Sequence, residues 1–172
     1  LFLLIYWLCG FTLQAGLLML MGVALMVMIV SDLEHYIIPD ELLTALLPLA
    51  LIYHYVMGSG VRDMLGGFAL GLAIGLALQY GYRWLRHREG LGFGDVKFLA
   101  IAGLWLGVRP IVPFLFLAGI FGIATGLLWR AIGRGQVFPF GPSLALSLLV
   151  CVAFPALPKL FWNIGQFVAL SK

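Results

Sequence analysis

The amino-acid sequence predicts an all-α integral membrane protein, a bundle of about six transmembrane helices that forms a single domain over residues 1–172. Hydrophobic residues make up 63% of the chain and charged residues only 10%, whereas soluble domains carry about 25% charged residues. Long apolar stretches recur from one end of the chain to the other. The alternation of apolar and polar residues typical of transmembrane β-strands is absent, so helices remain the way to satisfy backbone groups in lipid.

The apolar stretches and their interruptions define the expected helices. Residues 1–9 are expected to be the end of an N-terminal helix, and the start without Met indicates a fragment or a missing upstream part. The spans after it are expected at residues 12–31, 41–57, 64–85, 94–107, 110–132 and 141–157. At 1.5 Å per residue the fourth span is about 21 Å long, short of the roughly 30 Å apolar core of a bilayer. We therefore expect one of its ends to lie below the membrane surface.

Two spans carry glycines at a spacing of four residues. The third span has Gly67, Gly71 and Gly75, and the fifth has Gly122 and Gly126. This spacing lets the backbones of two transmembrane helices approach closely. We expect both sets of glycines to pack against neighbouring helices.

Composition argues against several kinds of partner. The net charge of +3 is small and no basic run resembles a nucleic-acid patch, so no nucleic acid is expected. Cys9 and Cys151 lie inside apolar stretches and no CxxC is present, which predicts small buried residues rather than a zinc site or a disulfide. A lone Asp-Glu-His cluster after the first span is weak evidence for a metal. We expect no cofactor and no metal.

The alternation of the spans assigns the connections to the two faces of the membrane. The connections at residues 32–40, 86–94 and 131–140 share one face, which Asp32 and Asp95 also share. Six Lys and Arg residues lie on this face and four on the other, which favours the first face as cytoplasmic. The first group is Arg83, Arg86, Arg88, Lys97, Arg130 and Arg134, and the second is Arg62, Arg109, Lys159 and Lys172.

The stretch SDLEHYIIPDEL holds the first candidate for chemistry. Asp32 directly follows an uninterrupted apolar run, and a carboxylate at a helix C-terminus faces the negative end of the helix dipole, which disfavours its ionised form. Asp40 follows Pro39 and precedes a new apolar run, so we interpret it as a helix N-cap rather than a catalytic residue. Glu34 and His35 are expected to be solvated loop residues.

The stretch GLGFGDVKFLA holds the second candidate. Gly90, Gly92 and Gly94 allow unusual backbone conformations and leave room for another part of the chain to approach. Asp95 stands at the start of the fourth span and Lys97 just inside it. Taken without the rest of the sequence, these residues fit a structural role as well as a catalytic one. In the structural role, Asp95 caps the helix and the side chain of Lys97 extends to the membrane interface.

The two aspartates are more informative as a pair. Like charges at close range cannot both ionise, so two carboxyl groups can share a single proton. The ionised carboxylate can then activate water as a general base while the neutral one polarises the scissile carbonyl, as in aspartic proteases. An ionisable residue at membrane depth is a functional candidate by default.

The stretch VFPFGPSLALS precedes the last span. Pro139, Gly141 and Pro142 make a non-helical entry to that span, with Pro142 in its first turn. The stretch falls on the same face as both aspartates. It is therefore either a helix start alone or a substrate-binding or supporting loop.

Three of these segments together resemble the signatures of the type 4 prepilin peptidases, which belong to the GxGD class of intramembrane aspartic proteases. The segments are DLEHYIIPD, GFGDVK and PFGPSLAL, and their order, spacing and placement beside apolar spans all agree. One GxGD alone would be weak evidence, but three motifs in order are specific. The resemblance covers the chain from about Thr12 to Leu157.

The resemblance implies roles for individual residues. Asp32 and Asp95 would be the catalytic dyad, and Gly92 and Gly94 would be the glycines of the GxGD motif. Lys97 falls on the lysine that often follows this motif. Many members also carry a cytoplasmic insert with paired CxxC motifs and methylate the new N-terminus with S-adenosylmethionine. Nothing in this sequence resembles that insert, so we do not predict methyltransferase activity.

The resemblance also implies a substrate and a location. The substrate would be a prepilin or pseudopilin of a type IV pilus, type II secretion or DNA-uptake system. Its short basic leader would be cut on the cytoplasmic side of the bacterial inner membrane, typically after a glycine, while the following hydrophobic helix stays in the bilayer. The partners expected are therefore this substrate and the lipid bilayer.

Three other interpretations fit less well. Presenilin-like proteases share GxGD, but their first aspartate follows Tyr, whereas Ser31 stands here, and the PAL tripeptide at residues 155–157 closes the last span on the opposite face. A small proton- or ion-coupled transporter subunit could use intramembrane charges, but no inverted repeat is apparent. A membrane scaffold leaves the paired aspartates unexplained.

Overall fold

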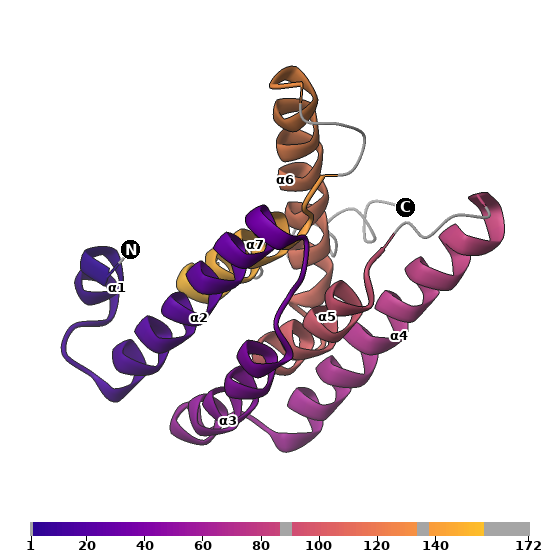
Figure 1. Ribbon diagram of the computed structural model, residues 1–172. Coiled ribbons are helices and arrows are strands. Elements are labelled where there is room, and N and C mark those ends of the chain that lie inside the picture. The colour runs from indigo at the N-terminus through magenta and orange to yellow at the C-terminus, as the bar shows by residue number, and fades with distance from the viewer. Residues whose placement is uncertain (1, 87–90, 134–137, 157–172) are drawn as a thin grey trace, which may run out of the picture.

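The computed structural model describes residues 2–86, 91–133 and 138–156, and within these ranges all regular structure is helical (Figure 1). The predicted all-α class is confirmed. The helices are α1 (Phe2–Cys9), α2 (Leu13–His35), α3 (Asp40–Met57), α4 (Val61–Arg86), α5 (Phe93–Leu106), α6 (Ile111–Ala131) and α7 (Gly141–Ala153).

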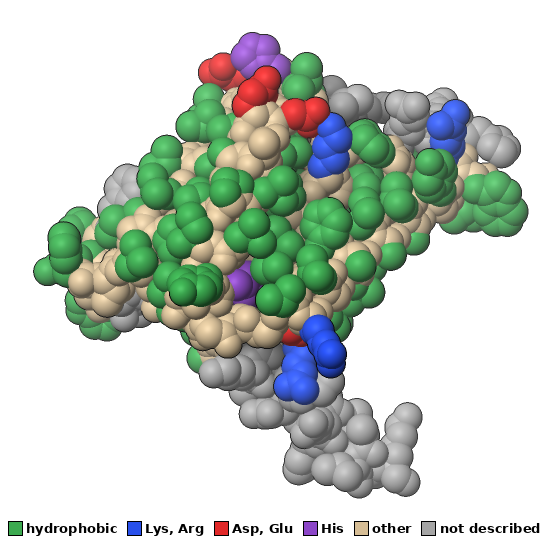
Figure 2. All heavy atoms as spheres, turned by 90° about the horizontal axis from the view of Figure 1, so that it is seen from below, with side chains coloured by type: hydrophobic (Ala, Val, Ile, Leu, Met, Phe, Trp, Pro, Cys, Tyr) green, Lys and Arg blue, Asp and Glu red, His purple; other side chains and the backbone are tan. Residues whose placement is uncertain are grey.

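Four of these helices, α2, α3, α4 and α6, are long and apolar enough to cross a membrane. The helices α5 and α7 are shorter, with 14 and 13 residues. Figure 2 shows charged side chains gathered at opposite edges of the molecule, with a broad hydrophobic band between them. This distribution is the one that a protein crossing a bilayer requires.

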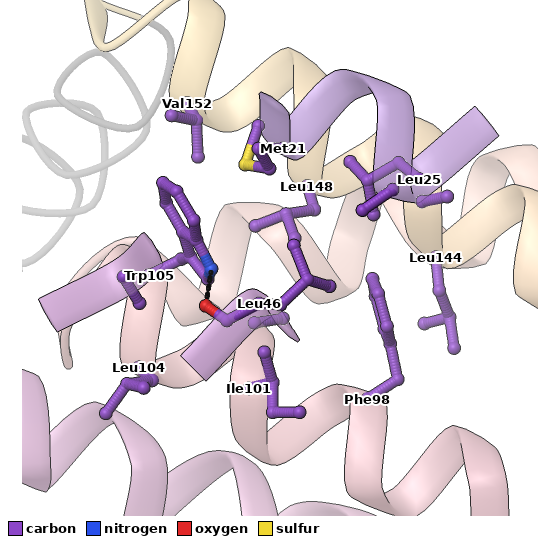
Figure 3. Close-up of a cluster of buried hydrophobic side chains, with 14 of the residues drawn as sticks. Met21, Leu25, Leu46, Phe98, Ile101, Leu104, Trp105, Leu144, Leu148 and Val152 are labelled. Atoms are coloured by element: carbon purple, nitrogen blue, oxygen red, sulfur yellow. Dashed lines mark hydrogen bonds between the residues drawn. The ribbon is translucent and has the colours of Figure 1, made fainter. Parts of the chain in front are cut away.

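The short helix α5 lies at the centre of the bundle. Nine of its 14 residues are buried, and it contacts α3, α4, α6 and α7. Figure 3 shows the side chains of Phe98 and Trp105 among residues from other helices, including Leu46, Leu144 and Leu148. The indole N–H of Trp105 also donates a hydrogen bond of 3.1 Å to the carbonyl of Leu46 on α3. From Phe98 to Leu106 the helix is apolar on every face, which suits this buried position.

The helices α4 and α5 pack backbone against backbone. A Cβ atom at Gly67 would overlap the carbonyl oxygen of Gly103, and one at Gly71 would overlap that of Leu99. A Cβ at Gly75 would lie 3.2 Å from the Cα of Val96. The expectation that the third span uses its glycines for close helix packing is therefore confirmed.

The glycines of α6 face a different neighbour. A Cβ atom at Gly122 would lie 2.7 Å from the ring of Phe140, and one at Gly126 would lie 3.7 Å from the ring of Phe138. Both aromatic residues belong to the segment before α7. The expectation that a helix packs on these two glycines is wrong, because they make room for large side chains of a connection instead.

The helix α2 is longer than expected. It continues past residue 31 to His35, so Asp32 lies in its last turn, and Glu34 and His35 are exposed helical residues rather than loop residues. The helix ends at Tyr36, which has φ 56° and donates its N–H to the carbonyl of Asp32 at 3.0 Å. This left-handed position usually carries Gly or Asn, and a tyrosine gives no such signal in the sequence.

The helix α7 is shorter than expected. It ends at Ala153 rather than at residue 157. Phe154 precedes Pro155 and has a non-helical conformation, with φ −121° and ψ 73°. A residue before proline is disfavoured in the helical region because it collides with the proline ring. The end of the PAL tripeptide, Leu157, lies outside the described residues.

We predict that Gly67→Ala lowers the melting temperature of the purified protein in detergent by several degrees. The new Cβ would press on the backbone of α5, and overpacking of this kind costs about 1–3 kcal/mol. The matched control is Gly81→Ala on the same helix, where a Cβ meets no described atom within 4 Å. An equal effect of the two substitutions on thermal unfolding would contradict the role given to Gly67.

Candidate active site

The end of α2, the connection from α2 to α3 and the beginning of α5 enclose a cavity of about 590 Å³. Asp32 lines it together with residues 36–41, residues 92–95 and Lys97. The structure thus brings Asp32 and Asp95 into one cavity, as their shared membrane face predicts.

Asp32 is held by the start of α7. Its side chain is buried, with 6% of its surface exposed, and its Oδ2 accepts a hydrogen bond of 2.8 Å from the backbone N–H of Gly141. A Cβ atom at Gly141 would lie 2.6 Å from the same oxygen. Only glycine therefore leaves room for this carboxylate while presenting its N–H to it.

Asp95 is held by its own helix terminus. It is the third residue of α5, and its Oδ2 accepts a hydrogen bond of 3.2 Å from the N–H of Gly92. The interpretation of Asp95 as a cap is therefore confirmed, and the same carboxylate lines the cavity. A Cβ at Gly94 would lie 3.1 Å from the Cβ of Ile38, so this glycine lets the α2–α3 connection approach α5 closely.

Lys97 binds Asp40 rather than standing alone at the interface. Its Nζ lies 2.7 Å from both carboxylate oxygens of Asp40 and 5.3 Å from the centre of the Phe93 ring. Asp40 is the first residue of α3, and the N-cap position belongs to Pro39, which makes no side-chain capping bond. The interpretation of Asp40 as an N-cap is wrong, because the ammonium on α5 takes both of its oxygens.

A strained turn leads from α2 into the connection that lines the cavity. The left-handed conformation of Tyr36 costs of order 1–3 kcal/mol in a residue that is not glycine. The ring of Tyr36 meets the ring of Trp129 on α6 edge to face, with 6.4 Å between centroids. The hydroxyl of Ser31 donates to the carbonyl of Ile37 at 3.0 Å. These contacts hold the turn in place, and no sequence signal pointed to them.

The remaining predicted site residues lie behind the cavity or outside the described residues. Pro139 and Pro142 are buried and, like Gly141, are not part of the cavity lining. Their place is at the start of α7, which carries the N–H that binds Asp32. Gly90 lies outside the described residues. Cys151 is a buried free cysteine, as expected.

Among the residues that the structure describes, no three His, Cys, Asp or Glu side chains form a group that could hold a metal ion. The cavity instead combines four carboxyl groups with one ammonium group. The carboxyl groups belong to Asp32, Asp40, Glu41 and Asp95, and the ammonium group belongs to Lys97. Chemically, such a site can bind cations and can exchange protons with water between paired carboxyl groups.

Residues 18–127 match the model of the type IV leader peptidase family. The chain belongs to this family. The match includes Asp32 and Asp95, the α2–α3 connection and all of α5. The family assignment made from the three sequence motifs is therefore confirmed.

Several characterised proteins are similar to the chain. A prepilin leader peptidase/N-methyltransferase of Pseudomonas aeruginosa is 32% identical over 82% of this chain and 50% of its own length. A protein of the same description from Stutzerimonas stutzeri is 30% identical over the same shares. The leader peptidase HopD of Escherichia coli is 37% identical over 67% of this chain and 78% of its own length.

The chain spans about half the length of the first two of these relatives. No solved structure matches it.

We predict that the Asp40–Lys97 ion pair contributes little to stability. The two side chains are 66% and 39% exposed, and double-mutant cycles on exposed pairs typically give about 0.2–1 kcal/mol. Asp40→Asn, Lys97→Met and the double variant would be compared by their free energies of unfolding in mild detergent. A coupling energy of several kcal/mol would show that the pair supports the bundle itself.

Proposed function

We propose that the chain is a membrane-embedded aspartic endopeptidase that removes the short basic leader of type IV prepilins or pseudopilins on the cytoplasmic face. Asp32 and Asp95 would act as its general acid and base. The observation that carries this proposal is that two carboxyl groups from different helices share one cavity. Membership of the leader peptidase family and the names of the relatives support the substrate class.

The proposed reaction uses one proton shared by the two carboxyl groups. The ionised carboxylate takes a proton from water, and the water oxygen attacks the scissile carbonyl carbon. The protonated carboxyl group gives its proton to the carbonyl oxygen. When the tetrahedral diol collapses, the C–N bond breaks and the leaving amine takes the proton of the pair. One hydroxyl of the diol returns its proton to the pair as the C=O bond re-forms, so one shared proton remains.

The backbone would orient both carboxyl groups for this reaction. Each has one oxygen that accepts a hydrogen bond from a backbone N–H, from Gly141 to Asp32 and from Gly92 to Asp95. We assign the second oxygen of each group to the water molecule and the substrate carbonyl. Because the donors belong to helix starts, they are fixed before substrate arrives and need no rearrangement.

The charge of the cavity suits a basic leader. Asp40 and Glu41 add two carboxylates to the pair, and Lys97 is already bound by Asp40. A cavity with an excess of one sign attracts a substrate of the opposite sign. The excess of Lys and Arg on this face in the sequence supports a cytoplasmic orientation in the bacterial inner membrane.

We predict that Asp32→Asn and Asp95→Asn each lower cleavage of a prepilin by at least about a hundredfold, because each removes one partner of the acid–base pair. The wild type and both variants would be mixed with a prepilin in detergent or lipid, and the new N-terminus of the product would be sequenced. The wild type should make a single cut after the leader glycine.

The matched control is Asp40→Asn, which removes a third carboxyl group from the same cavity. We expect this variant to keep cleavage within about tenfold of the wild type, because exposed ion pairs contribute little. An inactive Asp40→Asn protein beside an active Asp32→Asn protein would show that the proposed pair is wrong.

We also predict that Gly141→Ala lowers kcat by about tenfold or more without unfolding the protein. Its Cβ would lie 2.6 Å from Oδ2 of Asp32 and would displace the carboxylate. Gly119→Ala on α6, where a Cβ meets no described atom within 4 Å, is the control. If both variants cleave prepilin at the wild-type rate, the N–H of Gly141 does not orient Asp32.

A further inference from the structure

A lateral groove runs between α3 and α4. Both helices pack against α5 but hardly touch each other, because they diverge from the short link at residues 58–60 (Figure 1). The groove has a volume of about 300 Å³, and α5 forms its floor. Its apolar lining consists of Leu43, Leu47, Phe68, Leu72, Ala100 and Ile101.

The groove opens at the outer surface of the bundle, between α3 and α4. Thr44 on α3 is exposed, while Leu47 on the same helix and Phe68 and Leu72 on α4 are half-buried. Both flanking helices are long and apolar enough to cross a membrane. A segment that enters this groove therefore comes from the bilayer, where a peptide must satisfy its backbone groups as a helix.

The groove is continuous with the cavity of the two aspartates. Asp40 and Lys97 line both spaces, so their ion pair stands at the boundary between them. On α5 the boundary is short, because Asp95 in the cavity and Ile101 in the groove are about 9 Å apart along the helix axis. A polypeptide with its scissile bond beside Asp95 would thus extend directly into the groove.

We propose that this groove binds the apolar transmembrane helix that follows the scissile bond of the substrate, an inference that rests on the proposed peptidase function. The apolar lining accepts side chains of such a helix, and the acidic cavity accepts a basic segment at its aqueous end. The partner is therefore an apolar helix with a basic extension. The groove positions the bond between the two parts at the aspartates.

Leu72→Trp tests this proposal by filling the groove from α4. The assay compares two substrates, a prepilin with its full apolar helix and a soluble peptide that ends a few residues after the scissile bond. We expect the ratio of kcat/KM for the long over the short substrate to fall at least tenfold. The control is Ala73→Trp, which adds the same side chain at the next, exposed position outside the groove lining and should keep the wild-type ratio.

An unchanged ratio in Leu72→Trp would overturn the proposal. So would an equal loss on both substrates, which would mean that lipid or structural packing fills the groove. If the wild type cuts neither substrate, the proposed peptidase function fails. The crosslinking experiment that follows tests the groove without cleavage. Failure of the groove proposal and failure of the peptidase proposal can therefore be told apart.

Disulfide crosslinking tests the contact directly. Thr44→Cys would be placed in a protein with Cys9→Ala, Cys151→Ala and Asp95→Asn, and single cysteines would be moved along the apolar helix of a prepilin. With copper phenanthroline as oxidant, we expect crosslinks at every third or fourth position of that helix. The control is Ile123→Cys, at an exposed position of α6, which should give no crosslinks. No crosslinks at Thr44→Cys, or equal crosslinking at both sites, would overturn the proposal.

Discussion

The arrangement of the bundle depends on the close contact between α4 and α5. In lipid, apolar side chains alone give little reason for helices to associate, so close backbone packing supplies the attraction. Gly67 and Gly71 provide that contact against Gly103 and Leu99. Because α5 is too short to span a bilayer, these contacts and the packing of α3 and α7 fix its depth and therefore the place of Asp95.

The candidate active site is built from helix ends rather than from helix faces. Asp32 stands in the last turn of α2, where the helix dipole disfavours a negative charge. The N–H of Gly141 at the start of α7 opposes this effect, because helix starts present unpaired donors that bind anions. Asp95 uses the N–H of Gly92 at the start of α5 in the same way. Each of the two carboxyl groups thus accepts a hydrogen bond from a backbone N–H at a helix start.

The ion pair of Asp40 and Lys97 lies between two different environments. On one side lies an acidic cavity, and on the other an apolar groove between α3 and α4. The proposed substrate, with its basic segment and apolar helix, would contact both environments at once. The divergence of α3 from α4 supplies the groove, and the central position of α5 connects it to the aspartates.

The sequence by itself determined the helical membrane class, the order of the helices, the short α5 and the shared face of Asp32 and Asp95. Each of these follows from local hydrophobicity, residue spacing or the alternation of spans, which a sequence displays directly. The glycine contact of α4 was also predictable, because its four-residue spacing is a local pattern.

Only the tertiary structure decided which groups hold the aspartates and what lies beside them. Gly141 and Asp32 are 109 residues apart, and Lys97 and Asp40 are 57 residues apart. No local pattern marks such pairs, because helix packing alone brings them together. The same holds for Tyr36, whose left-handed conformation ends α2 and is supported by an edge contact with Trp129 from α6.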